Sequence, residues 1–286
     1  MSAKNKKKKN SKISYIFLII ALLIFIGVGI NLFIYIRNII KAEKTFDTVK
    51  ELIIIDNSTD DSTDNNKKAN IDGNRLIPDY SQVYTTNSDY VGWIKVQGTK
   101  IDYPVMQTPD DEQYYLHRNF YKKYDYSGVP FCSADADLKR PSENIVIYGH
   151  HMRAGTMFSN LDLFKKESFY KSHKTFTFDT IYRSGTYEII AVCLTDANDG
   201  SFPYWMYIDC SEADFNDYLT WMSANALYHT DGINSVQYGD KLVTLSTCAY
   251  HVNNGRLIVI GKLIDSDDAD IFTEKTIYNE DETDYN

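Results

Sequence analysis

The sequence has few cysteines and no closely spaced set of metal-ligating residues. Its four cysteines, Cys132, Cys193, Cys210 and Cys248, lie far apart in a chain of 286 residues. A disulfide-stapled scaffold needs more cysteines, and a zinc site needs them in short-spaced pairs, so the spacing argues against both. One disulfide among the first three stays open, although small buried thiols fit these positions better. We predict no metal and no cofactor.

Positive charge is scarce beyond the first twelve residues. Residues 1–12 carry six lysines and no acid, so removing these six charges from the net −9 leaves −15 for the rest of the chain. Binding to DNA or RNA needs lysine and arginine gathered on one face. The acidic body therefore argues against a nucleic-acid partner, and against a body that binds membranes peripherally.

An uncharged stretch runs from Ile13 to Ile36 and ends at Arg37. As a helix rising about 1.5 Å per residue it would reach roughly 36 Å, enough to cross a hydrocarbon core of about 30 Å. A cleaved signal peptide has a shorter apolar stretch of roughly 7–15 residues and a small-residue cleavage site, which this segment lacks. We predict a retained single-pass anchor over residues 13–36 in the cell membrane. The basic segment 1–12 is expected in the cytoplasm and the remaining chain outside the cell.

The remaining chain divides into a linker, one domain and a tail. Residues 37–74 form the predicted linker: 37–55 could continue as a short helix, and 56–74 are rich in Asp, Asn, Ser and Thr. Residues 75–265 have the length of one domain and no internal repeat. Residues 266–286 are acidic without periodicity, which predicts a poorly ordered tail.

Short β-branched and aromatic runs bounded by turn residues dominate the domain, and they predict strands. One amphipathic helix is expected from about Ser159 toward His173. A second starts at Ser211, with Asp214 as its capping-box partner, and a short third one follows Pro78. Many short strands with few helices favour a mostly β fold that closes into a barrel. The predicted strands are 91–96, 101–107, 144–148, 175–179, 186–195, 241–247 and 256–264.

Three of these strands border residues that can perform chemistry. His150 follows one strand directly after Gly149, Cys248 lies at the tip of another, and Arg256 opens a third after a short loop. Residues at strand tips are held by a rigid scaffold yet face solvent. A thiol can attack a carbonyl, an imidazole can protonate a leaving amine, and a guanidinium can stabilise the oxyanion. The three residues together indicate a cysteine enzyme.

Other interpretations of the same residues stay open. His151 and His251 are rival bases, and His150 is preferred because it immediately follows the glycine turn. Cys248 could equally be a core residue, His150 a strand cap and Arg256 a surface charge.

Longer motifs around these residues resemble the sortase family. The string TLSTC at 244–248, with Arg256 eight residues later and YGHHM at 148–152 before it, is similar to the sortase signature. The serine of TLSTC resembles class B in particular. The resemblance covers about 75–264. Further matches are DYVGWI at 89–94, IDYPV at 101–105, YYLHRNF at 114–120 and a long helix over 211–229.

The resemblance implies an eight-stranded sortase-type barrel with a few peripheral helices, and a two-step transpeptidation without a cofactor. Cys248 would attack the threonine carbonyl of a sorting motif near the C-terminus of another exported protein. His150 would protonate the leaving amine, and Arg256 would hold the substrate backbone and the oxyanion. A peptidoglycan amine would then resolve the thioacyl enzyme and leave the protein linked to the wall.

The resemblance also implies two substrate contacts and shows one departure. Leu116 resembles a wall of the motif-binding groove, and Ser246 resembles a residue that contacts the substrate. Where class B members usually have asparagine, this chain has Glu112. The preferred sorting motif is therefore left open.

Two other function classes remain as alternatives, and the first is a different wall-directed enzyme, either a cysteine peptidase or an L,D-transpeptidase. An L,D-transpeptidase has a histidine-glycine pair just before its cysteine, where this chain has Ser246 and Thr247. Papain-like peptidases usually place the cysteine before the histidine, the reverse of the order here. The last alternative is a non-catalytic, membrane-anchored binding module in which Cys248 is structural.

Overall fold

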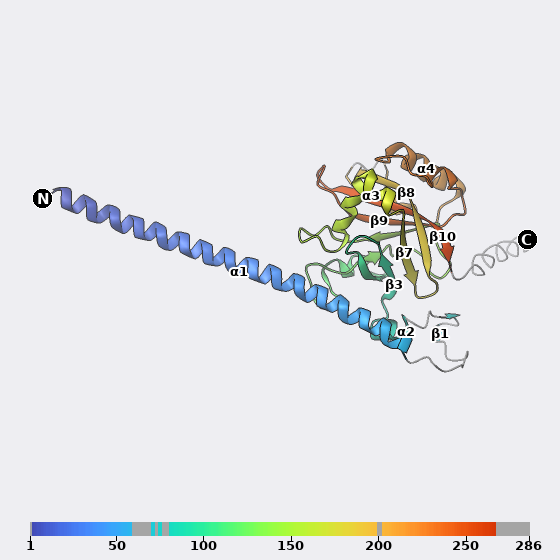
Figure 1. The fold of residues 1–286 in the computed structure, drawn as a ribbon, viewed down its shortest axis with the longest axis horizontal. Helices are drawn as coiled ribbons and strands as arrows, with labels where there is room; N and C mark the ends of the chain where they lie inside the picture. Colours follow the sequence, from blue (N-terminus) through green and yellow to red (C-terminus); the bar gives the residue numbers. More distant parts are fainter. Residues whose placement is uncertain (1, 59–69, 72–73, 76–79, 199–201, 267–286) are drawn as a thin grey trace, which may run out of the picture. The chain divides into compact units, whose positions relative to one another are not determined.

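Eight strands close into a barrel in the order β10-β8-β7-β3-β4-β5-β6-β9 (Figure 1). The computed structural model describes residues 2–58, 70–71, 74–75, 80–198 and 202–266. The β4–β5 and β6–β9 pairs are parallel and the other pairs in the barrel are antiparallel. The strands are β3 (Tyr90–Lys95), β4 (Asp102–Met106), β5 (Phe131–Cys132), β6 (Asn144–Tyr148), β7 (Thr175–Thr180), β8 (Gly185–Asp196), β9 (Leu242–Cys248) and β10 (Gly255–Ser266).

The predicted closed barrel is confirmed, and seven of its strands lie where the sequence placed them. The strand that the sequence pattern missed is β5. It has only two residues, so it shows no period-2 alternation, which is the signal on which strand prediction depends. It still completes the barrel, because Met106 of β4 pairs with Phe131 while Phe131 and Cys132 pair with β6.

Short helices cover the outside of the barrel. They are α2 (Ser81–Thr86), η2 (Tyr114–His117), η3 (Phe158–Lys165), α3 (Glu167–Ser172), η4 (Tyr204–Met206), α4 (Glu212–Asn225) and η5 (Ile233–Ser235), and a two-residue pair, β1 (Asn70–Ile71) and β2 (Asn74–Arg75), lies outside it. The helix expected after Pro78 is α2. In Figure 1, α4 lies against β8, and its apolar stripe Phe215, Tyr218 and Met222 is buried.

Two helix predictions were wrong in extent. The single helix expected from Ser159 to His173 is two helices separated by Lys166, whose backbone is extended. Phe158, Leu161 and Phe164 are buried at a spacing of three, which fits the three residues per turn of a 3₁₀ helix rather than an α-helix.

The helix expected over 211–229 begins as predicted but ends at Asn225. The hydroxyl of Ser211 accepts a hydrogen bond from the backbone N–H of Asp214, which caps the helix, and it donates to the Asp214 carboxylate at 2.6 Å. The helix stops because the backbone of Ala226 turns extended and bridges to Cys193 of β8. Pairing with the barrel replaces the last helical turn.

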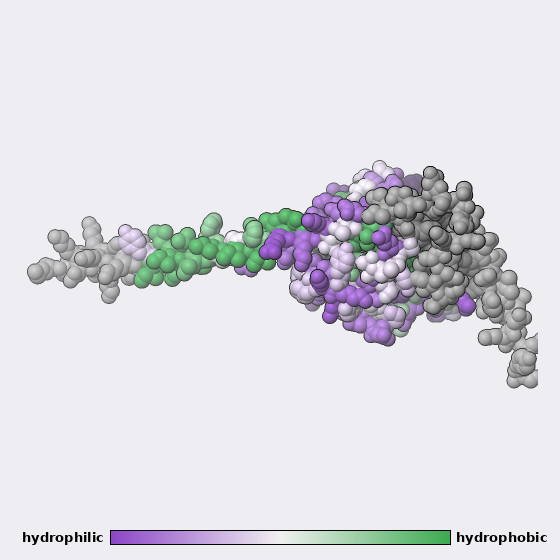
Figure 2. All heavy atoms as spheres, turned by 90° about the horizontal axis from the view of Figure 1, so that it is seen from below, coloured by the Kyte–Doolittle hydropathy of each residue, from purple (hydrophilic) through white to green (hydrophobic). Residues whose placement is uncertain are grey.

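One long helix, α1 (Ser2–Ser58), contains the predicted anchor. The chain divides into two compact units, Met1–Lys44 and Thr45–Asn286, so α1 contributes to both. Within the described residues, Tyr15–Ile53 is the one helical segment long and apolar enough to cross a membrane, by length and composition. Its large apolar side chains up to Ile36 are exposed, and Figure 2 shows them as a green surface.

The C-terminal part of α1 packs within the second unit. The Phe46 ring lies 4.9 Å from the Tyr103 ring, between centroids, and Val49 is fully buried. Asp102 of β4 accepts hydrogen bonds from Lys50 and, at 2.6 Å, from the indole of Trp93. The sequence placed these residues in a linker and began the domain at residue 75, whereas in the structure Phe46, Val49 and Lys50 belong to the same compact unit as the barrel. The predicted acidic tail lies outside the described residues, apart from Ser266.

Phe46→Ala should lower the free energy of unfolding of a fragment that starts at Lys41 by about 2–4 kcal/mol, because it removes a buried ring and leaves a cavity. Urea unfolding followed by circular dichroism measures the change. Asp47→Ala is the matched control, since Asp47 is exposed on the same helical turn. Equal stabilities of the two variants would contradict the packing of this segment on the barrel.

Candidate active site

Three neighbouring strands bring the predicted residues into one row. In the parallel β6–β9 pair, Tyr148 lies opposite Ser246, and the Gly149 N–H continues the ladder by donating to the Ser246 carbonyl at 3.0 Å. His150 follows at the level of Cys248. In the antiparallel β9–β10 pair, Cys248 lies directly opposite Arg256. Side chains at directly opposed positions point to the same face, so the thiol has the imidazole on one side and the guanidinium on the other.

Buried polar contacts hold the β6–β9 pair in this register. The Thr247 hydroxyl donates to the Gly149 carbonyl at 2.8 Å, next to both the thiol and the imidazole. Further down the pair, the Thr244 hydroxyl donates to the Asn144 side-chain oxygen at 2.9 Å and lies 2.8 Å from the hydroxyl of Tyr218 on α4. Buried polar groups without partners are costly, and these contacts satisfy them only in this register.

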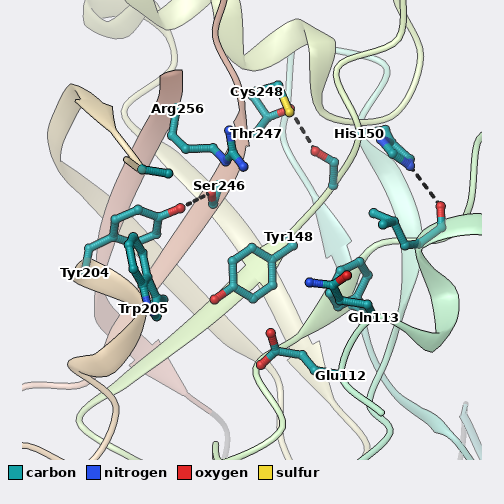
Figure 3. A pocket seen from close by; sticks show the side chains of 14 residues that line it. Glu112, Gln113, Tyr148, His150, Tyr204, Trp205, Ser246, Thr247, Cys248 and Arg256 are labelled. Carbon is teal, nitrogen blue, oxygen red and sulfur yellow. Dashed lines mark hydrogen bonds between the residues drawn. The ribbon is translucent and has the colours of Figure 1, made fainter. Parts of the chain in front are cut away.

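A cavity of about 570 Å³ opens beside the row, and all five predicted site residues line it. Figure 3 shows Cys248 between Arg256 and His150 at one end of the cavity and Glu112 at the other. The hydroxyl of Ser246 lies 2.6 Å from that of Tyr204 on η4, which joins the floor of the cavity to its side wall. The lining consists of Glu112, Gln113, Leu116, Phe131, Tyr148, Gly149, His150, Ala197, Tyr204, Trp205, Ser246, Thr247, Cys248 and Arg256.

Cys248 is the one cysteine with an accessible thiol. All four cysteines are free, so the disulfide left open by the sequence does not form, and the other three are buried. Burial raises the pKa of Cys193 to about 12 and of Cys210 to about 11, and it raises the pKa of Cys132 well above its usual range. A thiol must lose its proton to act as a nucleophile, so these three are inert.

The His150 ring is fixed by a main-chain contact. Its Nε2 lies 2.8 Å from the carbonyl oxygen of Leu116. Since a carbonyl oxygen only accepts, Nε2 carries the hydrogen and Nδ1 is the unprotonated nitrogen of the neutral ring. Burial lowers the pKa of His150, with the Leu116 carbonyl acting against this shift and His117 adding to it. The neutral imidazole therefore prevails at neutral pH.

The two rival histidines are placed differently. His151 lies 3.0 Å from the carboxylate of Asp162 and packs edge-on against Tyr250. His251 is exposed on the turn after Cys248 and lines a separate hollow formed by residues 248–256. Neither lines the cavity that contains Cys248, His150 and Leu116.

The Arg256 guanidinium is held by its own turn. Its Nη1 donates to the carbonyls of Asn254 and Gly255, both at 3.1 Å, and no carboxylate of the described residues pairs with it. Its remaining N–H groups are available to a ligand carbonyl or to an oxyanion in the adjoining cavity.

Several lining residues were not predicted as site residues. Tyr148 stood inside a recognised motif, and its place at the end of β6, two residues before His150, could have revealed it. Tyr204 and Trp205 belong to η4, a single turn with no strong sequence signal. Glu112 accepts a hydrogen bond from the Ala134 N–H at 3.0 Å. Within the described residues, no group of histidine, cysteine and acidic side chains could hold a metal ion.

The known proteins with similar sequences are sortases. The sequence model of the Sortase domain matches residues 94–264. Sortase B of Staphylococcus aureus is 31% identical over 190 residues, which cover 65% of this chain and 75% of that protein. Sortase B of Listeria monocytogenes is 33% identical over 181 residues, 62% of this chain and 71% of that protein.

Solved structures agree with these relatives. The structure of Clostridium perfringens sortase B is 36% identical, with a TM-score of 0.59, and the match covers 64% of this chain and 98% of that one. A Staphylococcus aureus sortase B–substrate complex is 25% identical, with a TM-score of 0.66, over 78% of this chain and 96% of that one.

Iodoacetamide should label Cys248 at least about tenfold faster than the other three cysteines, because only Cys248 is partly exposed and the buried thiols hold their protons. Mass spectrometry of tryptic peptides, sampled over time at pH 7.5, measures the four rates. Labelling in urea is the control, since unfolding should make the four rates similar. A buried cysteine that reacts as fast as Cys248 in the folded protein would contradict the assignment.

Proposed function

This chain belongs to the sortase family and is a class B sortase, a cysteine transpeptidase, and we propose on this premise that Cys248, His150 and Arg256 are its catalytic residues. The observation that supports this assignment is the row of these three side chains across β6, β9 and β10, beside a cavity that can hold a peptide. Nucleophile, acid and oxyanion donor are thereby presented to one carbonyl group.

In the first half-reaction, which proceeds from the less populated form in which His150 is protonated, the Cys248 thiolate attacks the threonine carbonyl of a sorting motif in an exported protein. A bond forms between Sγ and the carbonyl carbon, and the oxyanion lies against the Arg256 guanidinium. The carbon–nitrogen bond then breaks, and protonated His150 gives its proton to the departing amine. Since Nε2 stays bonded to the Leu116 carbonyl, the proton that moves is the one on Nδ1.

In the second half-reaction, an amine of the peptidoglycan precursor or cross-bridge attacks the thioacyl carbon. Neutral His150 takes the amine's proton, and Cys248 leaves as a thiolate, so the enzyme is regenerated. The acyl part of the substrate stays bound through both steps, in the cavity beside the thiol. Leu116 and Ser246, both in its lining, are proposed to contact that part of the motif.

The N-terminal helix supports a membrane-anchored enzyme. We infer that residues 13–36 span the membrane, with the lysine-rich segment 1–12 in the cytoplasm and the barrel outside. The cell membrane then keeps the active site close to a lipid-linked amine acceptor, which raises the effective concentration of one for the other.

A library of pentapeptide motifs incubated with the enzyme tests the proposed chemistry, with cleavage and acyl-enzyme formation followed by mass spectrometry. Cys248→Ala should abolish both without unfolding the barrel. Arg256→Lys should lose about 10²–10³-fold in kcat/KM, nearly as much as Arg256→Ala, because lysine lacks the planar fork of donors. Arg153→Lys, an exposed arginine elsewhere on the surface, is the matched control. Substantial activity in the Cys248 variant would place the nucleophile elsewhere.

The anchor makes a separate prediction. In intact cells the protein should sediment with membranes, and protease added outside should remove the barrel while the lysine-rich segment stays protected. A form that lacks residues 1–37 should still cleave sorting peptides in solution, yet anchor few proteins in cells, because it has lost proximity to the acceptor. Recovery of the protein from the medium with a new N-terminus near residue 37 would overturn the anchor. Equal wall anchoring by both forms would overturn the proximity argument alone.

A further inference from the structure

A second histidine lies against the ring of His150. The centroids of the His117 and His150 rings are 5.3 Å apart and their planes differ by 25°. The Tyr126 ring is nearly parallel to the His150 ring, with an interplanar angle of 8° and 6.5 Å between centroids. It also stacks on the His117 ring, with 6.0 Å between centroids and an angle of 17°. Tyr124 extends the stack outward, 6.5 Å from His117. His150 is thus the inner, half-buried member of a stack whose other rings are exposed.

The segment that carries His117 is built as a rigid support. The hydroxyl of the buried Tyr115 donates to Asp89 at 2.7 Å and accepts from Asn87 at 2.8 Å. Gly128, at a φ of +60°, passes so close to the Leu116 carbonyl that a Cβ would collide with it. These contacts hold the backbone of the turn that carries the Leu116 carbonyl and His117.

Two consecutive residues therefore constrain the same imidazole in different ways. The Leu116 carbonyl holds Nε2 and selects the tautomer, but a single hydrogen bond leaves the ring free to tilt about that bond. A ring stacked on the face of the imidazole removes this freedom. Nδ1, the atom proposed to deliver the proton, is then held in one direction.

We propose that His117 is a positioning residue for His150: its stacked ring holds the plane of the acid, and its own protonation opposes protonation of His150. This proposal rests on the proposed role of His150. Two imidazolium ions at stacking distance repel each other, so a proton on either ring disfavours a proton on the other. The lowered pKa of His150, to which His117 contributes after burial, agrees with this arrangement.

The other ionisable groups near His117 and His150 have contacts of their own or lie in the cavity. Cys248, Arg256 and Glu112 share the cavity with His150. The Arg118 guanidinium lies 4.1 Å from the Tyr114 ring centroid and donates to the Tyr114 carbonyl. In the loop packed against His117, the Asp125 carboxylate accepts from the Ser127 N–H. Within the described residues, none of these groups forms an ion pair with His117 or His150. The ionisable group that stacks directly on the His150 ring is therefore His117.

Two substitutions separate the two effects. His117→Phe keeps an aromatic ring but removes the charge, whereas His117→Ala removes both. With full-length enzyme and a cleaved sorting peptide, His117→Phe should keep kcat within about twofold and move the alkaline limb of the pH profile upward by roughly 0.3–0.5 units, because protonated His150 persists to higher pH. His117→Ala should lower kcat about five- to tenfold with little change in KM, because the acid is less well oriented. Lys123→Ala, an exposed residue in the same loop, is the control.

A direct titration makes the test independent of catalysis. Proton–carbon NMR of the imidazoles, with the His150 signal assigned through His150→Gln, should show the midpoint of His150 rising in His117→Phe. The proposal is overturned if both His117 variants match Lys123→Ala in kcat and pH profile. The proposal is also overturned if His117→Phe and His117→Ala lose activity to the same extent while the titration midpoint of His150 does not change. If the wild-type enzyme cleaves no peptide, the proposed function fails, and the titration still decides whether His117 controls His150.

Discussion

The hydrogen-bonded register of β6, β9 and β10 is the constraint on which the active site depends. His150 follows β6, which is far in sequence from β9 and β10, and the three functional side chains meet only because Tyr148 pairs with Ser246 and Cys248 pairs with Arg256. A slip of one residue in a strand would turn every side chain to the opposite face. The polar contacts of Thr244 and Thr247 act against such a slip, since each would lose its buried partner. The strand register that buries these polar groups with their partners is thus the same register that aligns the three site residues.

The same packing separates one reactive thiol from three inert ones. Cys193 lies on β8 beneath α4, whose Met222 carbonyl lies 3.8 Å from its sulfur, and burial there keeps the proton on the thiol. Cys248 is the last residue of β9, is only partly buried and lines the cavity. Position along the strand therefore decides whether a cysteine belongs to the core or to the chemistry.

Much of this arrangement could be predicted from sequence because it depends on periodic signals. Strands with alternating or continuous apolar runs were found, as were the residues at their tips. What could not be predicted depends on irregular backbone. The two-residue β5 has no period, and Lys166 divides one expected helix into two. The Leu116 carbonyl that sets the tautomer of His150 comes from a short 3₁₀ turn 34 residues away, and no side-chain pattern reveals a carbonyl. The role of His117 could not be predicted either, because no spacing in the sequence indicates which two rings will stack.

Glu112 shows how the regular scaffold accommodates a change in its binding surface. An asparagine at this position, usual in class B sortases, would offer both donors and an acceptor, whereas an ionised carboxylate only accepts. One carboxylate oxygen is occupied by the Ala134 N–H, and the carboxylate contributes, after burial, to raising the pKa of the Tyr148 phenol. The cavity thus has a guanidinium at the end near the thiol and a carboxylate at the other (Figure 3). A ligand group against Glu112 must therefore donate a hydrogen bond, whereas the carbonyl that reacts at Cys248 must accept one. This difference in charge between the two ends arises from side chains alone, without any change in the barrel that presents them.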